Sequence, residues 1–440
     1  MAARRGGWIA ALAIVLVMRV FDIASAHATL VSSDPAAGSS VASMPARIRL
    51  VFSEPVESGM ASVSLVGSGV TVKLPASGDP HDVHAILADA GGAAAIPPGG
   101  IRLEWHIVSA DGHPVGGSFV FSVGSPVPVG MVAAPDTAMA PDVTVWGPAI
   151  AGAPLIPAIF RGVGVGCLIA LCGLLSFIAL SGTSAARPSH VALGLSIATP
   201  LFLGMHLLAW MVNTSPTHHL DSAWLASLMS STVGKVELWR TALSLLPLWA
   251  LALARRPGLG LALAIPSLLA SAAVGHSAAI QPLWAVPLKA IHLAALAVWF
   301  GGLIWIIVRE RGDAHTTATD VARVSTLALW AVVAVTVSGI AQTLILVQST
   351  AGVRSPYGGV VIAKILGLAV LVGFGAYHRR RFVPAIASRG EAVAGALRTS
   401  VARELSVFCI VILLGGFLAY LSPPTRGAVN AGSHSSEHVP

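Results

Sequence analysis

The stretch Ile101-Arg-Leu-Glu-Trp-His-Ile-Val108 alternates apolar with polar side chains, which is the pattern of a β-strand with one buried face. Three more short runs of this kind lie within the first 124 residues, and Gly, Pro, Ser or Asp residues bound each one. They are 47–52, 61–66 and 118–123. Short alternating strands separated by turn residues predict an antiparallel β-sandwich or barrel. About 100 residues are enough to give it a hydrophobic core.

The first 26 residues have the pattern of an export signal. Arg4-Arg5 precedes an apolar run from Trp8 to Val17, and Ala24-Ser-Ala26 supplies the small residues of a signal-peptidase site. Cleavage there leaves His27 as the N-terminus of the mature chain, with the β-domain over residues 27–124. An uncleaved membrane anchor is the alternative for this segment.

The chain beyond this domain is predominantly apolar. Only 10% of all residues are charged and 55% are hydrophobic, whereas a soluble chain carries about 25% charged residues. We therefore expect a Pro/Ala-rich linker over 125–152, an all-α transmembrane bundle of eight helices over 153–422, and a flexible periplasmic tail over 423–440. The eight predicted spans are 155–180, 190–212, 236–254, 258–276, 287–308, 322–348, 358–378 and 404–421.

The basic residues predict the orientation of this bundle. Export of the first domain places it outside, and the loops then predicted to be inside carry most of the arginines, including Arg255-Arg256 and Arg379-Arg-Arg381. This distribution satisfies the positive-inside rule, so the net charge of +7 reflects topology rather than binding of nucleic acid. The predicted location is the inner (plasma) membrane, with segment 218–232 as an interfacial helix on the outer face.

The mature β-domain contains a candidate metal site. An N-terminal His27 offers both its α-amine and its ring nitrogen, and Asp111-Gly-His113 adds a carboxylate and a second imidazole. This set of three nitrogens and one oxygen suits Cu(II) in tetragonal geometry, while Zn²⁺ prefers a tetrahedron. Asp-Gly is also a common turn sequence, so an ordinary turn is the alternative at 111–113.

The same residues carry a resemblance to the CopC copper-binding proteins. The matching motifs are His27-Ala-x-Leu-x-x-Ser-x-Pro35, Phe52-Ser-Glu-Pro-Val56 and Trp105-x-x-x-Ser-x-Asp-Gly-His-Pro-Val115. The resemblance implies a cupredoxin-like Greek-key domain that binds Cu(II) through His27, Asp111 and His113, with Glu54 close to the metal. The Met-rich Cu(I) segment of some members has no counterpart here.

Histidines in the predicted bundle suggest a copper path. His206, His276 and His292 fall within ~10 Å of the outer surface when residues are counted at 1.5 Å each from the span ends. Ionisable residues are costly in a membrane and indicate function, although a histidine bonded to a backbone carbonyl is the alternative. Further candidates for the path, with Cu(I) as the ion in the membrane domain, are Met205, Met211, His218, His219 and His378. Packing is the alternative for the methionines.

Residues 155–422 resemble the CopD family of copper-resistance membrane proteins. The matching stretches are Gly275-His-Ser277, Lys289-x-x-His292 with Trp299-Phe-Gly-Gly302, and Tyr357-Gly358 to Lys364 followed by His378-Arg-Arg-Arg381. The family often has Asn where His378 stands. The order CopC then CopD in one chain is itself a family arrangement linked to copper uptake, so the resemblance implies copper import by a protein that is not an enzyme.

The sequence therefore predicts capture of Cu(II) outside the membrane and import of copper across it, in copper homeostasis or resistance. The expected partners are the copper ion, the lipid bilayer and periplasmic copper donors or reductants. Two alternatives remain open. One is copper sequestration or sensing, with the bundle as an anchor. The other is a membrane redox enzyme, either a copper oxidative enzyme or a cytochrome b-like protein.

Overall fold

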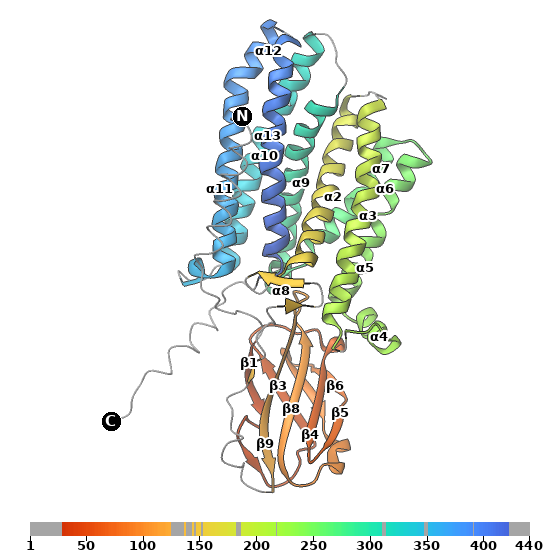
Figure 1. Ribbon diagram of the computed structural model, residues 1–440, viewed down its shortest axis with the longest axis vertical. Helices are drawn as coiled ribbons and strands as arrows, with labels where there is room; N and C mark the ends of the chain where they lie inside the picture. Colours follow the sequence, from red (N-terminus) through yellow and green to blue (C-terminus); the bar gives the residue numbers. More distant parts are fainter. Residues whose placement is uncertain are drawn as a thin grey trace, which may run out of the picture.

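The computed structural model describes residues 29–124, 136–137, 143–144, 147–150, 153–181, 186–216, 218–309, 314–346, 351–389 and 391–421. The predicted export signal, His27 and the predicted C-terminal tail lie outside these residues. The described chain forms a β-domain at one end of a bundle of long helices (Figure 1). The two-part architecture predicted from the sequence is confirmed.

Two sheets pack face to face in the β-domain. One has the order β1-β3-β7-β6, and the other has the order β10-β9-β8-β4-β5, with β2 parallel to β9. The strands are β1 Leu30–Asp34, β2 Ser40–Val41, β3 Arg47–Phe52, β4 Ser62–Gly67, β5 Val70–Leu74, β6 Ala76–Asp79, β7 Asp82–Asp89, β8 Gly99–Val108 and β9 Pro114–Val123. Two 3-10 turns, η1 Ser58–Met60 and η2 Gly91–Ala95, complete the domain.

The alternating pattern of the sequence explains the core of this sandwich. In β3, Ile48, Leu50 and Phe52 are buried while the residues between them face outward. β8 also alternates, and its Leu103 and Trp105 are buried on the side that faces the core. Because side chains alternate between the two faces of a strand, each of these strands contributes one apolar row to the core.

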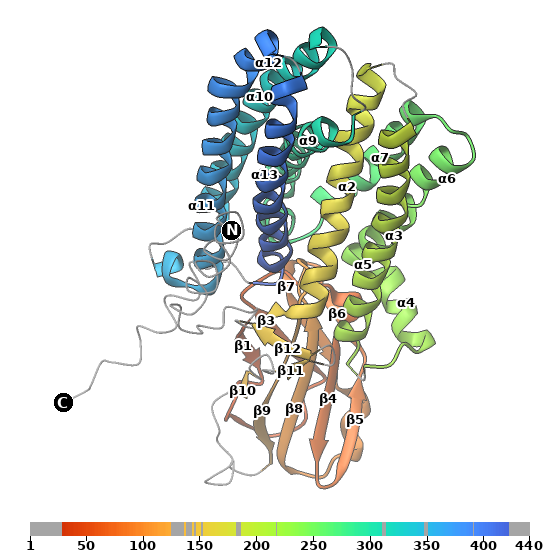
Figure 2. The same ribbon diagram turned by 45° about the horizontal axis from the view of Figure 1, so that its top comes forward.

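The described parts of the predicted linker form short strands. β10 Asp136–Thr137 extends the second sheet beside β9, and β11 Val143–Thr144, β12 Gly147–Ile150 and β13 Ala153–Pro154 make a small sheet of their own. The chain then enters the first long helix directly, so the linker ends at the top of the β-domain (Figure 2).

Each of the eight predicted spans falls on helical chain. The helices are α2 Leu155–Ser181, α3 Ala186–Thr214, α4 Ser222–Ser230, α5 Thr232–Leu243, α6 Leu246–Ala252, α7 Pro257–Ala272, α8 His276–Ile280, α9 Pro282–Val308, α10 Ala314–Leu346, η3 Ala351–Arg354, α11 Pro356–Tyr377, the π-helical turn η4 His378–Phe382, α12 Val383–Arg389 and α13 Glu391–Leu418.

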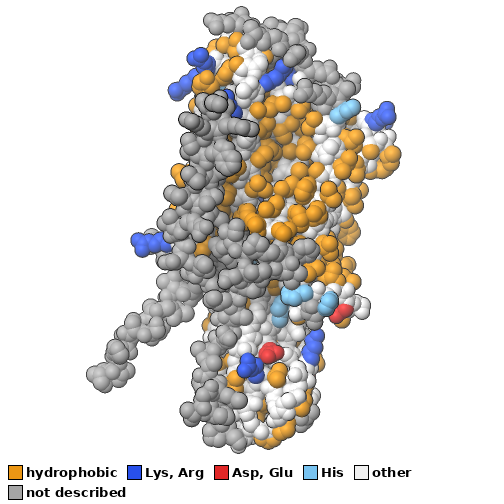
Figure 3. All heavy atoms as spheres, in the orientation of Figure 1, with side chains coloured by type: hydrophobic (Ala, Val, Ile, Leu, Met, Phe, Trp, Pro, Cys, Tyr) orange, Lys and Arg blue, Asp and Glu red, His pale blue; other side chains and the backbone are white. Residues whose placement is uncertain are grey.

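Six of the described helices are long and apolar enough to cross a membrane. The two remaining predicted spans are shorter. The span 236–254 is divided between α5 and α6, and the span 258–276 corresponds to α7, which has 16 residues. Figure 3 shows hydrophobic side chains over the visible face of the bundle, with histidines near the junction with the β-domain. The predicted interfacial helix is α4, which lies at this junction.

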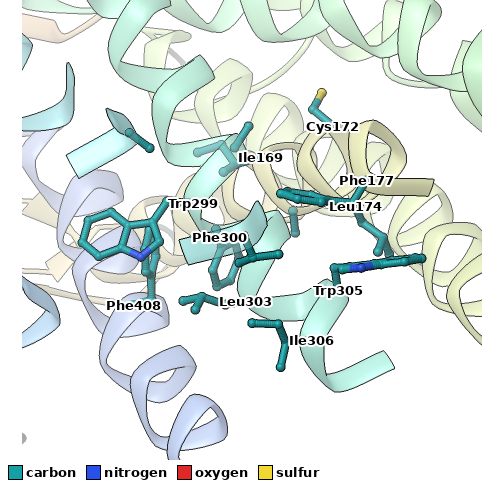
Figure 4. Close-up of a cluster of buried hydrophobic side chains, with 14 of the residues drawn as sticks. Ile169, Cys172, Leu174, Phe177, Trp299, Phe300, Leu303, Trp305, Ile306 and Phe408 are labelled. Carbon is teal, nitrogen blue, oxygen red and sulfur yellow. The ribbon is translucent and has the colours of Figure 1, made fainter. Parts of the chain in front are cut away.

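The core of the bundle lies where α2, α9 and α13 meet. Trp299 and Phe300 of α9 contact the ring of Phe408 on α13, with ring centroids 5.1 and 4.7 Å away (Figure 4). Glycines allow α2 and α9 to touch, because a Cβ on Gly173 would lie 1.9 Å from the carbonyl oxygen of Ala297. Close helix contact through small residues is typical of membrane bundles.

Candidate metal centre

The turn between β8 and β9 presents Asp111 and His113 on the side of the β-domain that faces the bundle. Gly112 makes the turn with a φ of +96°, a left-handed conformation that glycine adopts without strain. The carboxylate of Asp111 accepts hydrogen bonds from Ser109 Oγ and from the backbone N–H of His113, the latter at 3.1 Å. Its Oδ1 also lies 2.8 Å from Nδ1 of His113.

A histidine from the bundle completes this cluster. His276 is the first residue of α8, and its Nδ1 lies 2.5 Å from Oδ2 of Asp111. The rings of His113 and His276 stack with centroids 5.1 Å apart and planes 9° apart. All three residues are buried, and one ligand atom from each lies within 4.8 Å of the others. One carboxylate between two imidazoles can hold a borderline metal ion such as Cu(II) or Zn²⁺.

The charges at Asp111 and His276 favour metal binding. Burial acts to raise the pKa of Asp111, but the neighbouring His113 and His276 hold that pKa well below its usual value. Burial lowers the pKa of His276, with Asp111 opposing the shift. Burial acts to lower the pKa of His113 as well, but Asp111 and Glu54 raise it above its usual value, so a metal ion has to displace a proton there. The ionised carboxylate and the neutral imidazole are the forms that bind metals.

Glu54 lies beside the cluster. It lines a small cavity together with Pro55, Ala110, Asp111, His276 and Ala279. Burial, followed by the charge of Asp111, raises the pKa of Glu54 to about 7. A carboxylate with this pKa has lost part of its hydration, and an approaching cation would stabilise its ionised form.

A second cavity lies on the bundle side of the same carboxylate. It is lined by Asp111, Gly112, His113, Arg161, Trp210, Val233, Glu237, Ala419 and Tyr420. Asp111 borders both cavities, so the candidate metal centre lies between them.

Aromatic rings connect the cluster to His206 inside the bundle. Tyr420 meets His113 edge-on with ring centroids 5.7 Å apart, and its hydroxyl lies 3.2 Å from Nδ1 of His206. On the other side, Nε2 of His206 is 3.7 Å from Oε1 of Glu237. The chain from His113 through Tyr420 to His206 and Glu237 is almost completely buried.

Tyr420, Glu237 and its ion-pair partner Arg240 are not evident from the sequence as site residues. Glu237 forms ion pairs with Arg161, at 3.3 Å, and with Arg240 of its own helix. Arg240 is completely buried. The signal that could have found them is the pair of opposite charges three residues apart within an apolar span, which is costly in a membrane. Tyr420 gives no comparable signal.

The other predicted path residues lie elsewhere. Met205 is 37% exposed, and Met211 packs against the apolar cluster at the domain junction. His218 and His219 are exposed at the end of α3. Nδ1 of His292 lies 2.9 Å from Ser338 Oγ of α10. His378 is at the opposite end of the bundle, beside Glu404 and Ser400.

Several contacts hold the β-domain against the bundle. Trp210 of α3 donates a hydrogen bond from Nε1 to the carbonyl oxygen of Gly112 at 2.7 Å. The carboxylate of Glu57 accepts hydrogen bonds at 3.0 and 3.2 Å from the backbone N–H groups of Thr232 and Val233, at the N-terminus of α5. An apolar cluster covers both contacts and contains Met60, Val108, Trp210, Trp224, Leu228 and Val233.

Comparison with known proteins finds two families in the chain. Residues 30–124 match the CopC domain, and residues 318–418 match Copper resistance protein D. Copper transport protein CutJ of Bacillus subtilis is 26% identical over 93% of this chain and 77% of its own length. Copper resistance protein C of Pseudomonas syringae pv. tomato is 36% identical over 24% of this chain and 87% of its own length.

A solved structure is also similar to the N-terminal domain. The crystal structure of CopC from Methylosinus trichosporium OB3b is 30% identical, with 22% of this chain and 93% of that chain covered and a TM-score of 0.20. The chain belongs to the CopC family through its N-terminal domain and carries a Copper resistance protein D domain in the same polypeptide.

Proposed function

We propose that this protein captures Cu(II) with its β-domain on the extracytoplasmic side of the plasma membrane and imports copper through its helical bundle. The observation that carries the proposal is the meeting of Asp111 and His113, from the β-domain, with His276, from the bundle. A metal ion bound there touches both domains at once. Capture and entry into the bundle then share one site.

The donor set suits Cu(II) as the captured ion. Two imidazoles and a carboxylate are available among the described residues, and Cu(II) has the highest affinity of the divalent first-row metals for such ligands. His27 would add its amine and ring nitrogen.

Reduction would release the ion towards the bundle. When a one-electron reductant from the periplasm converts Cu(II) to Cu(I), the carboxylate of Asp111 becomes a poorer ligand and the imidazoles remain good ones. His276, stacked on His113, then keeps the ion on the bundle side. Tyr420 and His206 lie next along the buried chain, so we assign them to the entry of the path.

The relatives support copper as the cargo. The names Copper transport protein CutJ and Copper resistance protein C refer to this metal, and CutJ matches along 93% of the chain. The orientation rests on the basic turn Arg379-Arg-Arg381 at the end of the bundle away from the β-domain. Basic residues are enriched on the cytoplasmic side of membrane proteins.

The test is copper binding and copper uptake by the full chain with His276→Asn. We expect at least a 10- to 100-fold loss of copper affinity, because removal of groups that merely support a metal ligand already costs about this much. Uptake into cells at limiting copper should fall with it. His81→Asn, which changes an exposed histidine of the β-domain, should leave affinity and uptake unchanged.

Two outcomes would contradict the proposal. If His276→Asn binds copper as tightly as the unchanged protein, the ion is held by the β-domain alone. If the unchanged protein binds copper but cytosolic copper does not rise, import is wrong and sequestration or sensing replaces it.

A further inference from the structure

A second polar cluster lies at the end of the bundle away from the β-domain (Figure 1). His378 begins the π-helical turn after α11, and Glu404 lies on α13. Nδ1 of His378 is 3.2 Å from Oε2 of Glu404, and Nε2 of His378 is 2.7 Å from Ser400 Oγ. Both residues belong to helical segments long and apolar enough to cross a membrane. Ionisable pairs at such positions are costly and mark function.

Glu404 is the member with unmet hydrogen-bonding capacity. It is 1% exposed, and neither of its carboxylate oxygens receives a well-aligned hydrogen bond from the described residues. His378 is the ion-pair partner described for it. A buried carboxylate is stable only when it is paired or protonated, so this group is able to accept a proton.

Ser400 allows His378 to exist in either protonation state. A hydroxyl group can donate a hydrogen bond to Nε2 of a neutral imidazole, and it can accept one from Nε2–H of a charged imidazole. In both cases Nδ1 of His378 stays at ion-pair distance from Glu404, 3.2 Å from its Oε2. Because both ring nitrogens have polar partners, a metal ion would have to break one of these contacts. The geometry therefore favours a proton over a metal ion.

The surroundings of His378 are unusual for a helix in a bundle. π-helical turns are rare and occur frequently at functional sites. Three aromatic rings surround the imidazole, those of Phe374, Tyr377 and Phe382, with centroids 6.1, 6.0 and 5.7 Å away. Aromatic faces stabilise a nearby cation, which here would be the charged imidazole.

Apart from Glu404, the charged side chains described on α11, η4, α12 and α13 are basic, while the neighbouring α10 carries Asp320, which pairs with Arg309 at 3.0 Å. Arg379, Arg380 and Arg381 are exposed on the same turn, while Arg398 and Arg403 lie on α13. Lys364 is on α11, 14 residues from His378 and thus ~21 Å away along the axis. Arg161 of α2 and Lys289 of α9 belong to the other end of the bundle. Among the side chains described on α11, η4, α12 and α13, Glu404 is the one carboxylate. Asp320 at this end is already paired with Arg309, whereas the oxygens of Glu404 lack a hydrogen-bond donor among the described residues, so Glu404 is the proton acceptor we assign.

From this geometry we propose that His378 and Glu404 form a proton-binding site and that the proton bound there is coupled to copper movement. The proton-binding part of this proposal is argued only from the geometry of the His378–Glu404 pair. The coupling rests on the proposed copper import, and it gives the importer a driving force other than the copper gradient.

The first experiment tests the proton site without any transport. Infrared difference spectra of the full chain, recorded while the pH is varied, should contain a titrating carboxyl band that disappears in Glu404→Gln. The matched control is Asp320→Asn, because Asp320 lies at the same end of the bundle but is held by Arg309 at 3.0 Å. The control should retain the band. A titrating band that is unchanged in Glu404→Gln would overturn the assignment of the site.

The second experiment tests the coupling in proteoliposomes with an imposed pH difference. One proton per copper ion predicts a change of about tenfold in the copper accumulation ratio per pH unit, since one unit corresponds to a tenfold change in an equilibrium constant. Glu404→Gln should take up copper without this response. Copper binding at the Asp111 cluster, measured on the same sample, shows that the variant is folded.

The outcomes separate the two proposals. If copper uptake by the unchanged protein does not depend on the imposed pH difference, the coupling is wrong, and the proposed import still stands. Absence of copper uptake under every condition overturns import, and the infrared result still decides whether the proton site exists.

Discussion

At the scale of single residues, two glycines bring the metal ligands together. Gly112 and Gly275 have φ values of +96° and +102°, and each stands beside a histidine of the cluster. A Cβ on Gly112 would also lie 3.2 Å from Val233 Cγ1 and 3.4 Å from Trp210 Nε1. Glycine is therefore needed at 112 both for its backbone conformation and for the approach of the bundle.

His106 gives a prediction about pH at this scale. It points away from the sandwich core, as the alternation of β8 predicts, but its Nδ1 is buried without a hydrogen-bond partner among the described residues. Burial, together with nearby His218, lowers the pKa of His106 to about 4. An unfolded histidine has a pKa near 6.5, so the unfolded state binds more protons between these values. Stability should fall as the pH drops from about 6.5 towards 4.

We expect His106→Gln to remove part of this pH dependence. Thermal unfolding of the full chain at pH 7, 6 and 5 would measure it, with exposed His81→Asn as the control. An unfolding temperature that falls with pH equally in His106→Gln and in the unchanged protein would show that His106 does not contribute.

At the scale of helices, the contact of α2 with α9 sets the geometry of the bundle. Gly173 and Gly301 face each other so closely that a Cβ on Gly301 would lie 2.3 Å from the backbone of Gly173. Lys289 of α9 donates a hydrogen bond to the carbonyl oxygen of Val274, two residues before His276. Separation of α2 and α9 would therefore move a contact beside the metal centre.

This contact predicts the effect of Gly173→Ala. The new methyl group cannot be accommodated without moving the two helices, and overpacking of this kind costs about 1–3 kcal/mol of stability. Gly194→Ala of α3 is the matched control, because nothing lies within 4 Å of its Cβ position. Thermal unfolding in detergent measures both. An unchanged unfolding temperature in Gly173→Ala would contradict the close contact.

At the scale of the whole molecule, the β-domain docks on the bundle through one buried loop and one helix N-terminus. The hydrogen bond from Trp210 to Gly112 lies beside the metal ligands, and Glu57 binds the N-terminus of α5. A carboxylate at this end of a helix is favoured by the exposed N–H groups and by the helix dipole. The docking thus fixes the distance between His276 and the β-domain.

Trp210→Phe should loosen this docking. The substitution keeps an aromatic ring but leaves the carbonyl oxygen of Gly112 unpaired, which costs about 1–3 kcal/mol in a buried site. We expect faster amide hydrogen exchange in residues 109–113 and weaker copper binding. Trp239→Phe is the control, because Trp239 is 65% exposed. Equal exchange in both variants would mean that Trp210 does not hold the loop.

The sequence alone determined the two-part fold and the family. Alternation at 47–52 and 101–108 predicts the strands because a sandwich buries one face of each strand. Long apolar runs predict the membrane helices because a bilayer requires about 20 apolar residues per span. Asp111-Gly-His113 predicts a metal site only together with a predicted N-terminal His27, because the two segments then offer three nitrogens and one oxygen to one ion, while Asp-Gly alone is a common turn sequence.

Only the tertiary structure decided which bundle residues join that motif. His276 and His292 are equally plausible partners in the sequence, yet His276 reaches Asp111 while His292 bonds with Ser338. The structure also brings Tyr420, Glu237 and Glu404 next to histidines that are 214, 31 and 26 positions away in the chain. Such contacts depend on how helices rotate and pack, and the periodicity of one helix carries no information about the side chains of another.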